Sequence, residues 1–213
     1  MGRTHLLYPT YFPSISHFVA MIGADEICFE VDDHFQKQTN RNRMYIYSPN
    51  GVQMLNIPVK HSSIAHQKTR DVRIEPAFDW QKLHFRSLEA AYRSSPFFEF
   101  FEDTIMPVYE KKYTFLADLT FDSMEIAAKC MQWKLQYSKT EEFFHTPENA
   151  VDFRNLARGK KDESRFEDYP QVFADRHGFL NNLSILDLIF NEGRHAMAYL
   201  KRQPLPIPNT IAP

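Results

Sequence analysis

The spacing of apolar residues over the first 31 positions changes from strand-like to helix-like and back. Residues 6–8 predict a short strand, which ends at Pro9 because proline cannot donate a hydrogen bond to a central ladder. Apolar side chains three and four positions apart in residues 15–22 predict a helix that ends at Gly23. Residues 26–31 predict a second strand. Because strand, helix and strand fit within about 30 residues, we expect a parallel βαβ unit.

An Asn-Gly dipeptide at positions 50–51 marks a tight turn. Residues 44–47 and 52–59 flank it, so they predict the two strands of a β-hairpin, for which Asn-Gly is the strongest short-range signal. Two further short strands are expected over residues 71–74 and 133–137.

Helical spacing dominates the middle and the C-terminal part of the chain. Helices are expected over residues 80–92, 96–107, 114–131, 184–192 and 194–201. The inward face of the first of these is expected to carry Trp80, Leu83, His84, Leu88, Ala91 and Tyr92. Pro107 should end the second helix because it removes a backbone donor. Residues 138–182 have a weaker pattern, in which Thr146 and Pro147 favour one short helix through Leu156.

We therefore expect one α/β or α+β domain over residues 1–202, followed by a Pro-rich extended tail over residues 203–213. The domain should contain an N-terminal strand-helix-strand unit, a β-hairpin, and a helical middle and C-terminal part. A chain of 213 residues suits one domain, and its 19 Phe and 10 Tyr provide ample apolar surface for a core.

Charge and hydropathy exclude some classes of partner. The formal net charge of −2 gives no general attraction to nucleic acid, so we expect no nucleic-acid partner. No run approaches the roughly 20 apolar residues of a membrane span, and the N-terminus lacks the apolar core of a signal peptide. We therefore expect no membrane span and a cytoplasmic protein. Cys28 and Cys130 have no disulfide or metal-ligand spacing and are interpreted as small buried hydrophobes.

A dense polar segment over residues 32–43 directly follows the second predicted strand. Polar groups at that point lie where open α/β sheets bind ligands. Arginine forks and side-chain amides suit a carboxylate, a phosphate or a sugar hydroxyl, and Asp33 could act as a base. The expected substrate-binding residues are Gln36, Lys37, Asn40, Arg41, Asn42 and Arg43. The alternative is a solvated loop in which Arg41 and Arg43 neutralise Asp32 and Asp33.

His84 is the second candidate for acid/base chemistry. Its helical position places it on the inward face, where burial could tune its pKa. The alternative is a core histidine that donates to a carbonyl group. His61 and His66 flank a loop but have no cysteine or carboxylate at ligand spacing, so we expect no metal. The motifs for dinucleotides, P-loop nucleotides, zinc proteolysis and α/β-hydrolase chemistry are absent from the sequence, and the cofactor is unknown.

Seven segments in this order resemble the WbqC-like family, in particular its short versions from Bacteroidetes-type bacteria. They are residues 8–13, 35–43, 55–59, 71–74, 80–92, 95–98 and 183–191. The resemblance covers nearly the whole chain, and the family's association with surface-polysaccharide gene clusters implies a role in modifying sugars or their carriers. It also supports Gln36, Asn42, Arg43 and His84 as site residues. Asn40 departs from the aromatic residue expected there.

Two functions are compatible with this pattern. The first is an enzyme of bacterial cell-surface polysaccharide metabolism, a group transferase with a small-molecule substrate, either a sugar or an anionic carrier. Asp33 or His84 would move the proton in this reaction. The second is a non-catalytic binding or assembly module that engages a protein partner through its aromatic-rich helices and its Pro-rich tail.

Overall fold

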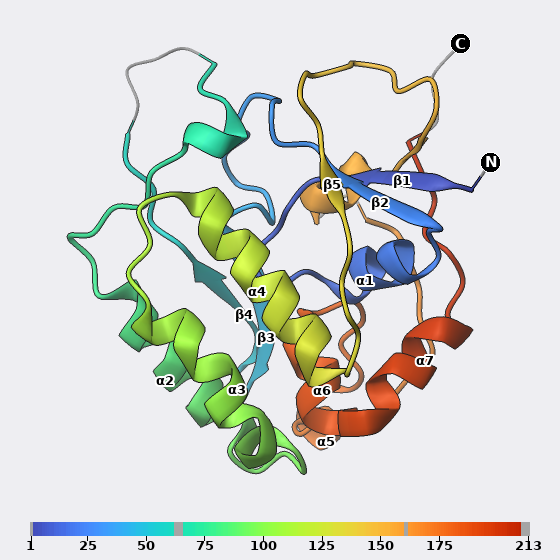
Figure 1. Ribbon diagram of the computed structural model, residues 1–213. Helices are drawn as coiled ribbons and strands as arrows, with labels where there is room; N and C mark the ends of the chain where they lie inside the picture. The colour runs from blue at the N-terminus through green and yellow to red at the C-terminus, as the bar shows by residue number, and fades with distance from the viewer. Residues whose placement is uncertain (1, 62–65, 160–161, 210–213) are drawn as a thin grey trace.

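The computed structural model describes residues 2–61, 66–159 and 162–209 and combines a small parallel sheet, a β-hairpin and packed helices (Figure 1). The strands of the sheet are β1 (Thr4–Leu7), β2 (Glu26–Phe29), β5 (Ser138–Lys139) and β6 (Val151–Asp152). They lie in the order β5-β2-β1-β6, and each neighbouring pair is parallel. The hairpin consists of β3 (Arg43–Ser48) and β4 (Gly51–Asn56). The α/β class and the hairpin expected from the sequence are confirmed.

The α-helices are α1 (Ile15–Ile22), α2 (Trp80–Tyr92), α3 (Phe98–Glu110), α4 (Leu116–Cys130), α5 (Ala174–His177), α6 (Ile185–Glu192) and α7 (Ala196–Arg202). The described residues also form the 3₁₀ helices η1 (Thr69–Asp71), η2 (Arg154–Arg158) and η3 (Gly193–His195). None of the described helices combines the length and the apolar character that a membrane crossing requires.

The predicted βαβ unit forms as β1, α1 and β2. Thr4 pairs with Glu26 and Leu7 with Phe29, so the two strands run parallel in register. Helix α1 begins after Ser14 and ends at Gly23, as its apolar spacing predicts. It is almost completely buried because it lies between the sheet and the helices α6 and α7 (Figure 1). This packing fixes the ends of β1 and β2.

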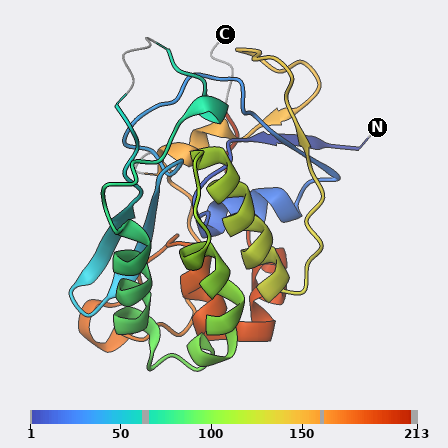
Figure 2. The same cartoon turned by 60° about the vertical axis from the view of Figure 1, so that its left-hand side comes forward.

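The hairpin packs against α2, and α3 and α4 pack against each other beside it (Figure 2). The buried face of α2 carries Trp80, His84, Leu88, Ala91 and Tyr92. Leu83, predicted on the same face, is 61% exposed, because it lies at the margin of the apolar stripe.

Several expected elements differ in the structure. Residues 71–74 form no strand: Asp71 ends η1, and Arg73 and Ile74 make only isolated bridges, with Phe115 and Val59, among the described residues. Residues 133–137 also lie outside the strands. Helix α3 continues through Pro107 to Glu110, because burial of Val108 and Tyr109 outweighs the backbone bond that proline lacks. The segment 147–156 contains β6 and the start of η2 instead of an α-helix.

The described part of the Pro-rich tail is extended and packs against the domain. The backbone N–H of Asn209 donates to the carbonyl oxygen of Asp152 at 2.7 Å, and Asn155 Nδ2 donates to the carbonyl oxygen of Ile207 at 3.0 Å. The tail therefore lies beside the end of β6, at the edge of the sheet where the candidate site is found.

Candidate functional site

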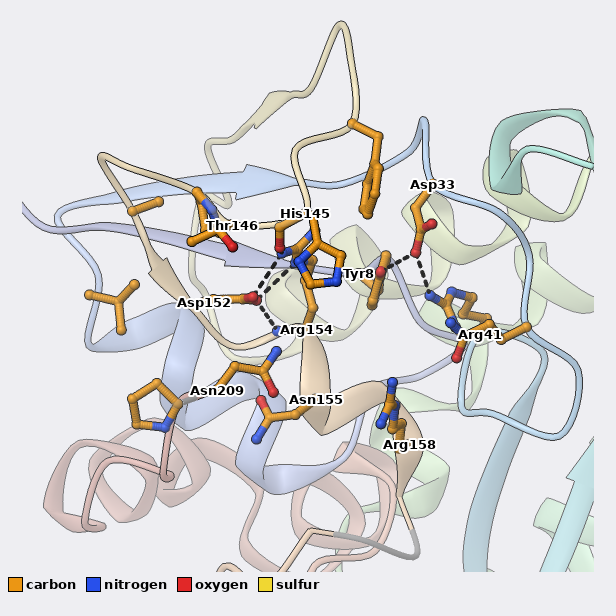
Figure 3. A pocket seen from close by; sticks show the side chains of 16 residues that line it. Tyr8, Asp33, Arg41, His145, Thr146, Asp152, Arg154, Asn155, Arg158 and Asn209 are labelled. Atoms are coloured by element: carbon orange, nitrogen blue, oxygen red, sulfur yellow. Dashed lines mark hydrogen bonds and ion pairs between the residues drawn. The ribbon is translucent and has the colours of Figure 1, made fainter. Parts of the chain in front are cut away.

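A polar pocket of about 780 Å³ lies at the carboxyl ends of β1, β2 and β6 (Figure 3). This edge is where open parallel sheets place ligands. The polar residues that line the pocket are Tyr8, Asp33, Gln36, Arg41, His145, Thr146, Asp152, Arg154, Asn155, Arg158 and Asn209. They come from four separate parts of the chain, so the site exists only in the folded domain.

Tyr8, Asp33 and Arg41 form one cluster in the pocket wall (Figure 3). The hydroxyl of Tyr8 donates to Oδ2 of Asp33, and Arg41 Nη2 lies 3.6 Å from the same oxygen. The guanidinium carbon of Arg41 lies 3.7 Å from the centre of the Tyr8 ring, a cation–π contact. Burial, and then the bond to Asp33, raise the pKa of Tyr8 above its ordinary value, so the phenol remains a donor. Burial lowers the pKa of Arg41.

Glu30, which directly follows β2, holds the backbone that carries Asp33. This carboxylate is completely buried, and its Oε1 accepts the backbone N–H groups of Asp32 at 2.7 Å and Asp33 at 3.1 Å. The hydroxyl of Thr140, which follows β5, donates to the same oxygen at 2.9 Å. Glu30 thus joins two neighbouring strand ends and fixes the direction of the Asp33 side chain.

Arg154 and Asp152 form the second charged cluster. Arg154 Nε and Nη2 donate to the two carboxylate oxygens of Asp152 at 2.9 and 2.8 Å, a bidentate pair. Burial opposes ionisation of Asp152, but the hydrogen bonds from Arg154 outweigh it and lower the pKa of that carboxyl group. Arg154 Nη1 and Nη2 also donate to the carbonyl oxygens of Phe144 at 2.9 Å and His145 at 2.8 Å. Arg154 therefore fixes the segment that places the imidazole of His145 over the pocket (Figure 3).

The structure divides the polar segment of residues 32–43 among several environments. Of the predicted site residues, Asp33, Gln36 and Arg41 line the pocket. Lys37 lines a separate small cavity, and Asn40 and Arg43 line another one near the hairpin. Their roles in binding stay predictions.

Two of the amide and guanidinium groups in this segment support the hairpin. Asn42 Nδ2 donates to the carbonyl oxygen of Ile57 at 2.9 Å, and Arg43 Nε donates to Oδ1 of Asn56 at 3.1 Å. Asp32 pairs with Lys68 at 2.7 Å and with Arg70 at 2.8 Å. Of the neutralising pairs considered from the sequence, the structure thus contains Arg41 with Asp33, while Asp32 has other partners.

His84 lies in the core, outside this pocket. Its Nδ1 lies 3.1 Å from the hydroxyl of Tyr11 and its Nε2 lies 3.2 Å from the carbonyl oxygen of Asn56. Burial lowers the pKa of His84 to about 4, so the imidazole is neutral at neutral pH. The structure does not bring His84 together with Asp33, and its predicted catalytic role stays untested.

Sequence reasoning missed the other polar residues that line the pocket, which are Tyr8, His145, Thr146, Asp152, Arg154, Asn155, Arg158 and Asn209. Tyr8 could have been found, because it follows β1 as Asp33 follows β2. Strand β6 has only two residues, so no alternating pattern predicts a strand there or points to Asp152 and Arg154. Asn209 reaches the pocket because the tail folds back against the domain, and no local sequence pattern predicts that contact.

The arrangement combines acceptors, cationic donors and an imidazole around one cavity. Such a set can bind an anionic or hydroxyl-rich molecule and can move a proton at Asp33 or His145. Within the described residues, no group of three or more His, Cys, Asp or Glu side chains is arranged to hold a metal ion.

Comparison with known proteins agrees with the resemblance seen in the motifs. The chain is 28% identical to the uncharacterized protein Rv1507c of Mycobacterium tuberculosis over 231 residues, covering 94% of this chain and 98% of that protein. No solved structure matches the chain. The family model described as the WbqC-like protein family matches residues 8–161, which include Tyr8, Asp33, Arg41 and Arg154. The chain belongs to the WbqC-like protein family.

Proposed function

We propose that this protein is a group-transfer enzyme of bacterial cell-surface polysaccharide metabolism whose substrate, a sugar or an anionic carrier, binds in the pocket at the sheet edge. The observation that carries the proposal is the convergence of Tyr8, Asp33 and Arg41 from separate segments onto one polar cavity. Pockets of ligand size with a few convergent polar groups are the usual sites of small-molecule chemistry. The family resemblance supplies the link to sugars.

Asp33 is the proposed base. Its carboxylate accepts bonds from Tyr8 and from the backbone N–H of His34 at 2.6 Å, which fix its orientation, and it retains capacity to accept one substrate hydroxyl. Removing the proton from that hydroxyl makes it a nucleophile for the incoming group. In this proposal His145, which lines the same pocket, returns a proton to the leaving group.

A thermal-shift screen of nucleotide sugars, acyl donors and sugar acceptors tests the proposal, because a ligand of the folded state raises its apparent stability. Compounds that shift the wild type are then incubated in pairs, and transfer products are identified by mass spectrometry. We expect Asp33→Asn to retain binding but to lose product formation by about a hundredfold or more, the usual size of a general-base effect.

Asp71→Asn is the matched control, because this carboxylate is exposed on η1 and does not line the pocket. Equal transfer by wild type and Asp33→Asn would remove the assignment of the base. Failure of every pair to give a transfer product would favour a binding protein.

The second candidate function is a non-catalytic binding or assembly module. It is favoured by large apolar side chains exposed on the helical side, notably Leu83 on α2 and Phe100, 75% exposed, on α3. Sedimentation of the wild type and of the double variant Leu83→Ser, Phe100→Ser tests self-assembly. A concentration-dependent mass that the double variant loses would support this function.

A further inference from the structure

The charges that line the pocket leave an excess of guanidinium groups. Among the described residues that line the pocket, the three arginines Arg41, Arg154 and Arg158 face two carboxylates, Asp33 and Asp152. Arg154 and Asp152 neutralise each other through their bidentate hydrogen bonds. The buried carboxylate of Glu30 also lies near this pair, with its Oε2 4.0 Å from Arg154 Nη1. Of the two lining carboxylates, Asp33 then remains to balance the positive charges of both Arg41 and Arg158.

The charge of Arg41 is incompletely compensated. Its side chain is 1% exposed, and its Nε and Nη2 have no hydrogen-bond partner among the described residues. Asp33 lies 3.6 Å away, beyond a hydrogen bond, and also accepts from Tyr8 and from the backbone N–H of His34. Because a buried charge needs a counter-charge to offset its desolvation, this arrangement favours an anion in the adjacent pocket.

Arg158 adds a second positive charge at the same place. It is exposed, extends from the end of η2 into the pocket lining, and forms no ion pair within the described part of the chain. Burial is the main cause that lowers the pKa of Arg41, and the positive charge of Arg158 lowers it further. Both guanidinium groups line one cavity and repel each other, and an anion bound between them would offset this repulsion.

Hydroxyl-binding groups lie farther along the cavity. Asn155, Asp152 and Asn209 occupy the wall on the side away from Arg41 (Figure 3). Amide and carboxylate groups of this kind bind sugar hydroxyls, whereas arginine forks bind carboxylate and phosphate oxygens.

Resting on the proposed function, we infer that the ligand is an anionic sugar whose carboxylate or phosphate group binds at Arg158 beside Arg41, with its hydroxyls toward Asn155 and Asn209. Arg158 is the direct contact because it is accessible from the pocket. Arg41 supplies a fixed positive charge from within the wall, where the low dielectric strengthens its attraction.

Three sugars that differ mainly in charge test this assignment by isothermal titration calorimetry. Glucose is neutral, glucuronate carries a carboxylate, and glucose 1-phosphate carries a phosphate. We expect one or both anionic sugars to bind at least about tenfold more tightly than glucose, and the stronger of the two identifies the anionic group. We also expect this binding to weaken as salt is added, because ions screen the attraction.

Arg158→Gln is the decisive variant because an exposed arginine can be replaced without loss of the core. We expect it to reduce the affinity for the anionic sugar by about tenfold or more, whereas Arg194→Gln, which alters an exposed arginine outside the pocket, leaves it unchanged. Equal affinity of Arg158→Gln and wild type, equal binding of glucose, or no binding of either anionic sugar would overturn the inference. Calorimetry measures binding without turnover, so its result is independent of the transfer assay. An anionic sugar that binds here but gives no product in the transfer assay would overturn the proposed reaction and leave the inferred binding site intact.

Discussion

The hydroxyl of Tyr8 donates a hydrogen bond to Oδ2 of Asp33, and this bond joins the chain just after β1 to the chain just after β2. The two strands are parallel neighbours, so their carboxyl ends emerge side by side. The Tyr8 ring also supports the guanidinium group of Arg41. One side chain therefore orients both the proposed base and the buried positive charge of the pocket.

Tyr8→Phe separates these two roles. The variant keeps the ring beneath Arg41 but leaves Asp33 without its phenolic donor, so we expect the free energy of unfolding to fall by about 1–2 kcal/mol. Urea unfolding measures this change. Tyr45→Phe is the control, because the described residues provide no hydrogen-bond partner for the Tyr45 hydroxyl. A loss of the same size in both variants would show that the bond to Asp33 contributes nothing specific.

Arg154→Leu should be the most destabilising change in the pocket wall. It leaves the partly buried carboxylate of Asp152 without its cation and frees the carbonyl groups of Phe144 and His145. Removal of one partner from a buried ion pair costs about 3–5 kcal/mol, and we expect urea unfolding to show a loss in that range.

The same variant should release the segment around His145 from the pocket. Limited proteolysis of Arg154→Leu is expected to cut within residues 141–150 faster than in the wild type, because that exposed segment is tied to Arg154. An unchanged cleavage rate would mean that other contacts hold His145 in place.

The sequence predicted the elements whose stabilising contacts are local. Helix α1 and the hairpin lie where apolar spacing and the Asn-Gly turn place them, although β4 ends at Asn56, three residues before the predicted end. Segments stabilised by tertiary contacts were mispredicted. Strands β5 and β6 have two residues each and exist because β1 and β2 offer them open edges. Such short strands have no periodicity of their own.

The candidate site shows the same limit. The rule that ligands bind after parallel strands selected Asp33, Gln36 and Arg41, which line the pocket, while their roles stay predictions. The rule could not distinguish these pocket-lining residues from Asn42 and Arg43, which support the hairpin, because all of them belong to one polar segment. That distinction depends on where β3 begins, at Arg43, and on the hairpin partner Asn56.

His84 should make stability depend on pH. Its pKa is about 4 in the folded protein and 6.5 in an unfolded chain, so between these values the unfolded state binds the proton and the folded state does not. The stabilisation is complete above pH 6.5 and is lost as the pH falls toward 4. When the pH falls from 7 to 5, the free energy of unfolding should decrease in both proteins. We expect the decrease to be about 2 kcal/mol smaller in His84→Gln than in the wild type, measured by urea unfolding. If both lose stability equally, His84 is protonated more easily than its burial implies, which would favour its predicted proton-transfer role.

The C-terminal tail, which the sequence pattern separates from the domain, forms part of the pocket wall. The family match ends at residue 161, yet Pro208 and Asn209 line the pocket, and the backbone of Asn209 bonds to the carbonyl group of Asp152. A side chain in that position can contact the ligand without contributing to the core.

We therefore expect Asn209→Ala to weaken binding of the anionic sugar by about three- to tenfold, the usual effect of one neutral hydrogen bond, while the free energy of unfolding changes by less than about 1 kcal/mol. Calorimetry and urea unfolding measure the two quantities. Asn50→Ala, an exposed change in the hairpin turn, is the control for affinity. A chain that ends at Pro204 should bind still more weakly, because it also loses the backbone bond to Asp152 and the contact of Ile207 with Asn155. If the shortened chain binds the sugar as the full chain does, the pocket is complete without the tail, and ligand contacts must come from residues 8–158 alone.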